Sequence, residues 1–167
     1  MADIKLAYGT ASDATITLAS LASDTNLLAG RESSAIDNST TLALDYLVSG
    51  KVTAGTSPTA ARSIEVWVVG SWDGTTWPDV FDGTGDSGET ITSADIKASV
   101  CRLLAAMATA NTTDRTYHFG PVSVASVFGG VVPPKFVVFV VHNTGQNLNS
   151  TAGNHQIRLQ PVYETVT

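Results

Sequence analysis

The sequence predicts an all-β protein: an antiparallel β-sandwich of the jelly-roll type, with an extended N-terminal segment and at most one or two short helices. Three observations support this fold class. Only 14% of the 167 residues are charged, whereas about 25% is usual in globular proteins. Threonine and serine fill the difference with 22 and 16 residues, and threonine suits exposed strands. Several segments also alternate between apolar and polar residues, as half-buried strands do.

The clearest strand pair is expected between residues 136 and 160. Residues 136–141, FVVFVV, are all β-branched or aromatic, which is typical of a strand covered on both faces. Residues 142–145, HNTG, supply polar and glycine residues where a turn is needed. Residues 155–160, HQIRLQ, alternate between polar and apolar with period two, as in a strand with one solvent-exposed face. We therefore predict that these strands form the last hairpin of the sandwich.

The earlier strands are predicted from the same alternation. Residues 4–8 and 15–18 are short alternating pieces in a small, polar segment, and they form either edge strands or part of an arm that orders against another subunit. Residues 41–53 and 63–71 are the clearest alternating strands before the centre of the chain. A tight turn at Asp73-Gly74 is expected after the second of them.

The centre of the chain is less uniform. Residues 94–110 fit a strand, and they also fit a helix because apolar residues recur near helical spacing, with Thr92 to Asp95 as its cap. Residues 117–121 end a strand at Pro121, because proline lacks a backbone donor. Residues 122–128 indicate a short helical turn closed by Gly129-Gly130.

The length and composition of the chain indicate its domain organisation and argue against several kinds of partner and location. We expect one domain at this length, with residues 1–38 as an N-terminal arm or edge strands and residues 39–167 as the β-sandwich. The net charge of −6 opposes binding to nucleic acid. No apolar run approaches the roughly 18 residues of a membrane span, and residues 1–5 lack the pattern of a signal peptide. The single cysteine, Cys101, fits a core position in a protein folded in a reducing cytoplasm.

No catalytic or metal site is evident. The acidic loop does not match an EF-hand frame, the three histidines lack metal-ligand spacing, and no serine or cysteine lies in a nucleophile motif. We therefore expect no enzyme activity, no cofactor, no metal and no small-molecule ligand. The groups weighed were Asp73, Asp79, Asp82 and Asp86 of the loop, and His118, His142 and His155.

Aromatic residues offer the one candidate interaction surface, which consists of Trp72, Trp77 and Phe128. Tryptophan and tyrosine are suited to protein interfaces, and a platform of Trp67, Trp72, Trp77, Tyr46 and Tyr117 would also suit a sugar. The structural alternative is that Trp67 belongs to the core and the other tryptophans hold their loop against the sheet.

Four segments, residues 30–60, 64–83, 117–145 and 148–166, resemble small virion proteins of tailed bacteriophages, of the capsid decoration or cement type. The resemblance extends from Gly30 onward, about four-fifths of the chain, and these four segments carry it through their overall residue pattern and not through a functional motif. It implies a β-sandwich on the outside of an icosahedral shell, assembled in the host cytoplasm, that bridges major capsid protein subunits as a dimer or trimer. It brings no catalytic residues. Alternatives are a tail or head–tail connecting protein, and a carbohydrate-binding β-sandwich that uses Trp72 and Trp77.

Overall fold

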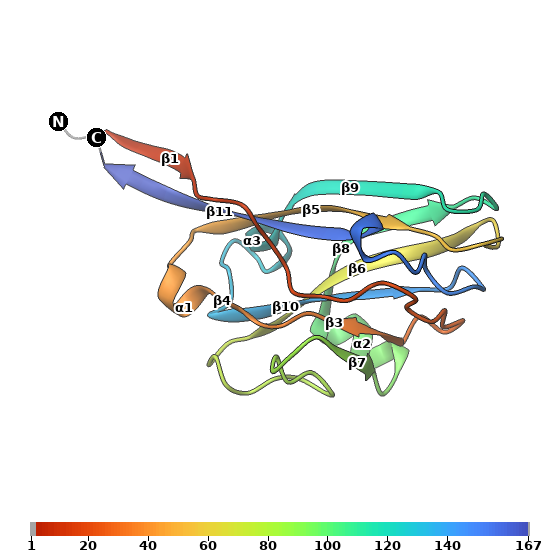
Figure 1. Ribbon diagram of the computed structural model, residues 1–167. Helices are drawn as coiled ribbons and strands as arrows, with labels where there is room; N and C mark the ends of the chain where they lie inside the picture. The colour runs from red at the N-terminus through yellow and green to blue at the C-terminus, as the bar shows by residue number, and fades with distance from the viewer. Residues whose placement is uncertain (1–2, 167) are drawn as a thin grey trace.

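Residues 3–166 are described by a computed structural model, and they form two antiparallel sheets packed face to face (Figure 1). The all-β sandwich predicted from the sequence is confirmed. Sheet A has the order β1-β11-β5-β9, with β2 also paired to β11. Its strands are β1 (Ile4–Tyr8), β2 (Ser12–Asp13), β5 (Asp45–Thr53), β9 (Thr116–Ser123) and β11 (Gln156–Val166).

Sheet B has the order β7-β3-β10-β6-β8, with β4 also paired to β10. Its strands are β3 (Ala29–Glu32), β4 (Ile36–Asp37), β6 (Arg62–Ser71), β7 (Ser87–Thr90), β8 (Cys101–Thr109) and β10 (Lys135–His142). The helical elements in the described chain are α1 (Asn38–Thr41), α2 (Ala94–Val100), α3 (Val124–Val127) and a 3-10 turn, η1 (Ala152–Asn154). None of these is long and apolar enough to cross a membrane.

Two apolar cores explain why β10 is apolar on both faces. The main core lies between the sheets and includes Val138 and Val140 of β10. The second core lies on the other face of sheet B, where Val137 and Phe139 of β10 meet Phe81 and residues of α2 and its flanks. Residues 136–142 are all fully buried. The prediction of a strand covered on both sides is confirmed, because the loop of residues 72–86 and α2 form a third layer on the outer face of sheet B (Figure 1).

The predicted hairpin between β10 and β11 is wrong. Strand β10 pairs with β6 on one side and with β3 and β4 on the other, so both of its edges are occupied within sheet B. Strand β11 pairs with β5 and β1 in sheet A. Its alternation of buried Ile157 and Leu159 with exposed Arg158 is as predicted. The segment between them crosses from one sheet to the other, and side-chain alternation carries no information about which strand is the neighbour.

Residues 94–110 contain both of the elements that the sequence allowed. Ser93 accepts a hydrogen bond from the backbone N–H of Ile96 and begins α2, as such caps do. The helix ends at Val100, and β8 starts at Cys101. The short helical turn predicted before Gly129 is confirmed as α3, whose Ala125 carbonyl accepts from Gly130. The single-turn helix α1, which begins at the cap Asp37, was not predicted, so the described chain has three short α-helices where at most two were expected.

Two smaller predictions are also corrected. Strand β9 does not end at Pro121 but continues to Ser123. The proline is tolerated because β9 is at the edge of sheet A and its register with β5 shifts between Val48 and Gly50. Residues 4–8 do form a strand, but residues 15–18 form none, and Leu18 inserts into the main core instead.

The N-terminal segment contributes to both sheets. Strands β1 and β2 pair with β11, whereas β3 and β4 pair with β10 and β3 also pairs with β7. The segment therefore supplies edge strands to sheet A and an internal strand to sheet B.

Cys101 lies in the second core, as predicted, with 2% of its surface exposed. Burial raises the pKa of its thiol to about 12, so the reactive thiolate is scarce at pH 8. We expect no reaction with a thiol-specific reagent in the native protein and one equivalent in denaturant. Fast labelling of the native protein, followed by absorbance, would contradict this packing.

Candidate interaction surface

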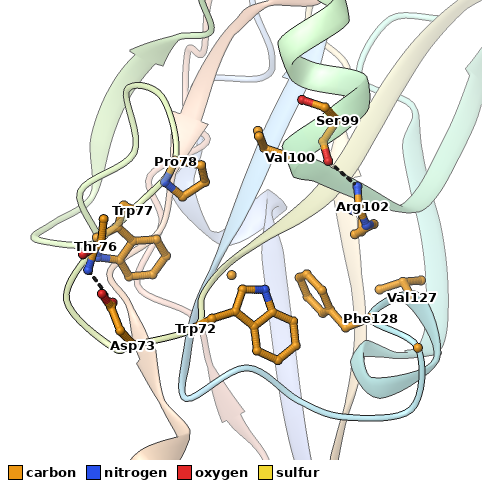
Figure 2. A pocket seen from close by; sticks show the side chains of 12 residues that line it. Trp72, Asp73, Thr76, Trp77, Pro78, Ser99, Val100, Arg102, Val127 and Phe128 are labelled. Carbon is orange, nitrogen blue, oxygen red and sulfur yellow. Dashed lines mark hydrogen bonds between the residues drawn. The ribbon is translucent and has the colours of Figure 1, made fainter.

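A cavity of about 810 Å³ lies where β6 ends and β8 begins (Figure 2). We call it the aromatic cavity. It is lined by Gly70, Trp72, Asp73, Thr76, Trp77, Pro78, Ser99, Val100, Arg102, Val127, Phe128 and Gly129. Its volume is in the range typical of binding sites. Three segments that are distant in sequence form it: the turn after β6, the junction of α2 with β8, and the end of α3.

The turn after β6 is held by one carboxylate. Asp73 accepts hydrogen bonds from the backbone N–H groups of Thr75 (2.8 Å) and Thr76 (2.6 Å) and from the hydroxyl of Ser71 (3.1 Å). Gly74 has a φ of +75°, which suits glycine. The hydrogen bonds from Thr76 and Thr75 hold the pKa of Asp73 well below its usual value. This carboxylate therefore stays ionised and is committed to the turn.

Trp72 is the most exposed aromatic side chain of the cavity, with 58% of its surface accessible. Its ring stands nearly perpendicular to that of Phe128, with 5.8 Å between centroids and an angle of 89°. Trp77 lies across the cavity from Phe128 (Figure 2). It is partly buried against the second core, and a side chain at Gly83 would collide with its ring. Trp77 thus packs its loop against the second core, while the exposed ring of Trp72 is available to contact a ligand.

Arg102 provides the positive charge of the cavity. Its Nη1 donates to the carbonyls of Ser99 (2.8 Å) and Cys101 (3.1 Å). Among residues 3–166, no carboxylate lies within ion-pair distance of this guanidinium, and no other hydrogen bond engages it. The cavity therefore combines aromatic rings with polar side chains, and its one guanidinium has remaining N–H groups that can donate to a ligand.

The structure gathers the three residues that the sequence singled out, Trp72, Trp77 and Phe128, around this cavity. Their role in an interaction stays a prediction. The broader five-aromatic platform is wrong. Trp67 packs at the second core, whereas Tyr46 is buried in the main core against Phe136. Tyr117 is partly buried, and its hydroxyl accepts from the N–H of Ala110.

The acidic loop residues are spread over separate local contacts. Asp79 bonds to Thr92, Asp82 to Thr84, and Asp86 to Arg31 and Thr17. No group of three or more metal-binding side chains occurs within the described residues.

The histidines lie apart from the cavity lining. His142 is buried, with its two ring nitrogens near Thr144 (3.0 Å) and the Leu21 carbonyl (3.0 Å). His155 contacts the Asn149 carbonyl at 2.8 Å, and His118 is exposed on β9. Burial lowers the pKa of His142 and of His155. Both therefore act as neutral structural residues near pH 7.

A second exposed apolar surface was not predicted. Strand β1 pairs with the end of β11, and this two-stranded extension projects beyond the rest of the sandwich (Figure 1). We call residues 4–8 and 162–166 the ribbon. Ile4, Leu6, Tyr8 and Val166 are each about two-thirds exposed. The alternation of residues 4–8 predicted a strand, but nothing local indicated that its apolar side would face solvent.

Besides the aromatic cavity and the ribbon, the described residues also expose the apolar side chains of Leu42, Leu44, Leu103 and Val131. No family model, curated protein or solved structure matches this chain.

Proposed function

We propose that this chain is a non-enzymatic virion protein, a capsid decoration or cement protein that binds the outside of a phage head and bridges major capsid protein subunits. The resemblance of the sequence to such proteins motivates the proposal. In this role the protein acts by covering surface and by associating with neighbours, as a dimer or trimer, and it uses no cofactor.

The observation that carries the proposal is that a rigid sheet, covered on both faces, occurs together with exposed apolar features at one end of the sandwich. Strand β10 is buried on both faces, so the sandwich resists deformation. The ribbon and the aromatic cavity expose apolar side chains to water, and exposed apolar patches mark sites of interaction with other molecules. The titratable groups of the cavity are Asp73, which is committed to its turn, and Arg102. This combination favours adhesion over chemistry.

The proposal is tested by adding purified protein to phage shells assembled without it. We expect the protein to cosediment with the shells, to saturate at a fixed ratio and to raise the melting temperature of the shells. Shells already saturated with the protein serve as the matched control and should bind no more. Absence of cosedimentation, or recovery of the protein only in tail fractions, would overturn the assignment to the head.

A second candidate function, binding of a carbohydrate, is favoured by the exposed ring of Trp72. Sugar sites also need polar groups that are free to bond hydroxyls. Asp73 is already engaged by its own turn, which leaves Arg102 as the charged side chain of the cavity able to bond hydroxyls and weakens this alternative. Titration of glycans against tryptophan fluorescence tests it: a saturable shift that is absent in Trp72→Ala supports sugar binding, and a flat response across a panel excludes it.

A further inference from the structure

The ribbon and the aromatic cavity lie at the same end of the sandwich. Val162, at the base of the ribbon, is paired with Asp45 at the start of β5. The Asp45 carboxylate accepts a hydrogen bond of 2.8 Å from the backbone N–H of Ala125 in α3. Helix α3 then leads directly to Phe128 in the cavity. A single hydrogen-bonded connection therefore links the two features.

The ribbon has one apolar face that bears a single negative charge. Its register places Ile4 opposite Val166, Leu6 opposite Glu164 and Tyr8 opposite Val162. Residues directly opposite in an antiparallel pair project from the same face, so Glu164 lies among the apolar side chains. Glu164 is exposed, and no described residue forms an ion pair with it. The opposite face carries Lys5, Ala7, Tyr163 and Thr165.

The ribbon is also incomplete as a sheet. Beyond Val162, β11 pairs with β1 alone, and the outer edge of β1 is unpaired in the described chain. Two strands by themselves are only marginally stable in water, and an apolar face left open adds to that cost. The ribbon therefore needs a surface against which to pack.

The aromatic cavity has the complementary chemistry. The ribbon offers aliphatic and aromatic side chains with one carboxylate, and the cavity offers Trp72 and Phe128 with one guanidinium. Arginine and carboxylate form strong, directional hydrogen bonds. Apolar side chains and aromatic rings are suited to form the centre of an interface. Side-chain chemistry and charge are therefore complementary between a protruding element and a hollow of the same chain.

We propose that the ribbon of a second copy of this chain occupies the aromatic cavity, with its apolar face against Trp72 and Phe128 and the second copy's Glu164 facing Arg102. Because both features lie at one end, two copies exchange ribbons reciprocally and form a closed two-fold dimer. Such an isologous contact ends at two subunits and does not grow into a fibre.

Other arrangements leave one feature unused. Pairing of β1 with β1 of another copy would satisfy its open edge but leave the apolar face and the cavity in water. Face-to-face packing of two ribbons would bring two Glu164 carboxylates into one apolar contact, which is unfavourable. Within one copy the ribbon points away from the body of the sandwich (Figure 1).

The exchanged contact is small, because each ribbon brings only a few large side chains. We expect a dissociation constant on the order of micromolar, as for interfaces near or below the standard size. When many copies lie close together on one surface, such weak contacts act together and hold neighbouring copies. A dimer formed in this way would have two sandwiches with which to bridge neighbouring capsid subunits. This part of the inference rests on the function proposed above.

The test is a charge swap followed by sedimentation equilibrium of the free protein, without shells. Arg102→Glu and Glu164→Arg should each weaken dimerisation about tenfold or more, because each places like charges across the contact. The double variant restores opposite charges and should recover to within about threefold of the wild type. Arg62→Glu, at the far end of β6, is the matched control and should leave association unchanged.

Three outcomes would overturn the proposal: a wild type that stays monomeric at about 100 μM, association that ignores Arg102→Glu, or a double variant that fails to recover although circular dichroism shows it folded. Loss of association in Leu6→Asp without any effect of Arg102→Glu would indicate strand pairing through the β1 edge. Because shells are absent, failure of shell binding would contradict the virion role and leave this result intact.

Discussion

Replacing Lys97 with methionine is expected to lower the free energy of unfolding by about 3–5 kcal/mol, the cost of breaking a buried ion pair from one side. Lys97 is only 7% exposed. Its ammonium donates to Glu65 at 2.9 Å and to the carbonyl of Leu27 at 2.6 Å, and it lies 4.5 Å from the ring centroid of Trp67. These contacts join α2, β6 and the segment before β3.

The physical reason is that the substitution leaves the Glu65 carboxylate and the Leu27 carbonyl buried, without Lys97 and without water in its place. Glu65 would keep the indole N–H of Trp67 at 2.9 Å but would lose its counter-charge, and the Leu27 carbonyl would lose its donor. Urea unfolding followed by tryptophan fluorescence measures the change. The double variant Lys97→Met/Glu65→Gln should recover part of the loss, because no charge then remains buried alone.

Lys135→Met is the matched control. Lys135 lies 3.9 Å from Asp37, and both side chains are at least one-third exposed. Such surface pairs contribute about 1 kcal/mol or less. If Lys97→Met costs no more than Lys135→Met, the Lys97–Glu65 pair does not join the layers as described.

The contrast between these two lysines shows where sequence patterns stop being informative. Local alternation predicted β5, β6 and β11, and the apolar run predicted a strand covered on both faces. The position of Lys97 in the sequence gave no sign of burial. Its environment depends on Glu65, 32 residues earlier on another strand, and on the third layer over sheet B. Strand partners escaped prediction for the same reason, because alternation specifies which side of a strand faces the core and not which strand lies beside it.

The candidate site was predictable only in its aromatic part. Trp72, Trp77 and Phe128 are large, rare residues that are often found in interfaces, and the structure brings them to one cavity. Arg102 was missed, since an isolated arginine after a cysteine carries no signal until the fold places it beside Phe128 and Trp72. The ribbon was not predicted as a surface because Leu6 and Tyr8 are exposed only where β11 extends beyond the start of β5, and the local sequence does not indicate that extension.

The second large effect is expected from pH and centres on Glu32 of β3. Glu32 is fully buried, one of its oxygens accepts the Gly83 N–H at 2.7 Å, and the other has no hydrogen-bond partner within the described chain. Burial, together with the nearby carboxylates of Asp82 and Glu89, raises the pKa of Glu32 to about 7, against an ordinary value of 4.5. The folded protein therefore holds a proton on Glu32 over a range in which the unfolded chain has released it.

The sign of the effect follows from this difference. A group that binds its proton more tightly when folded stabilises the protein at low pH. The contribution of Glu32 is fully present below pH 4.5 and is lost as the pH rises through about 7, for a total of about 3 kcal/mol. His142 and His155 act in the opposite direction below their ordinary pKa of 6.5, because burial lowers the pKa of each. A wild-type profile alone would therefore mix the two effects.

Glu32→Gln separates them, because glutamine imitates the protonated acid and keeps an oxygen for the Gly83 N–H. We expect the variant to match the wild type near pH 5 and to exceed its free energy of unfolding by about 2–3 kcal/mol at pH 8.5. Urea unfolding at both pH values measures this difference, from which the histidine contribution cancels. Equal pH profiles for the two proteins would contradict a protonated Glu32 in the native state. A gain confined to high pH would show that the Gly83 loop, against which Trp77 packs, is held by a neutral hydrogen bond and not by a charge.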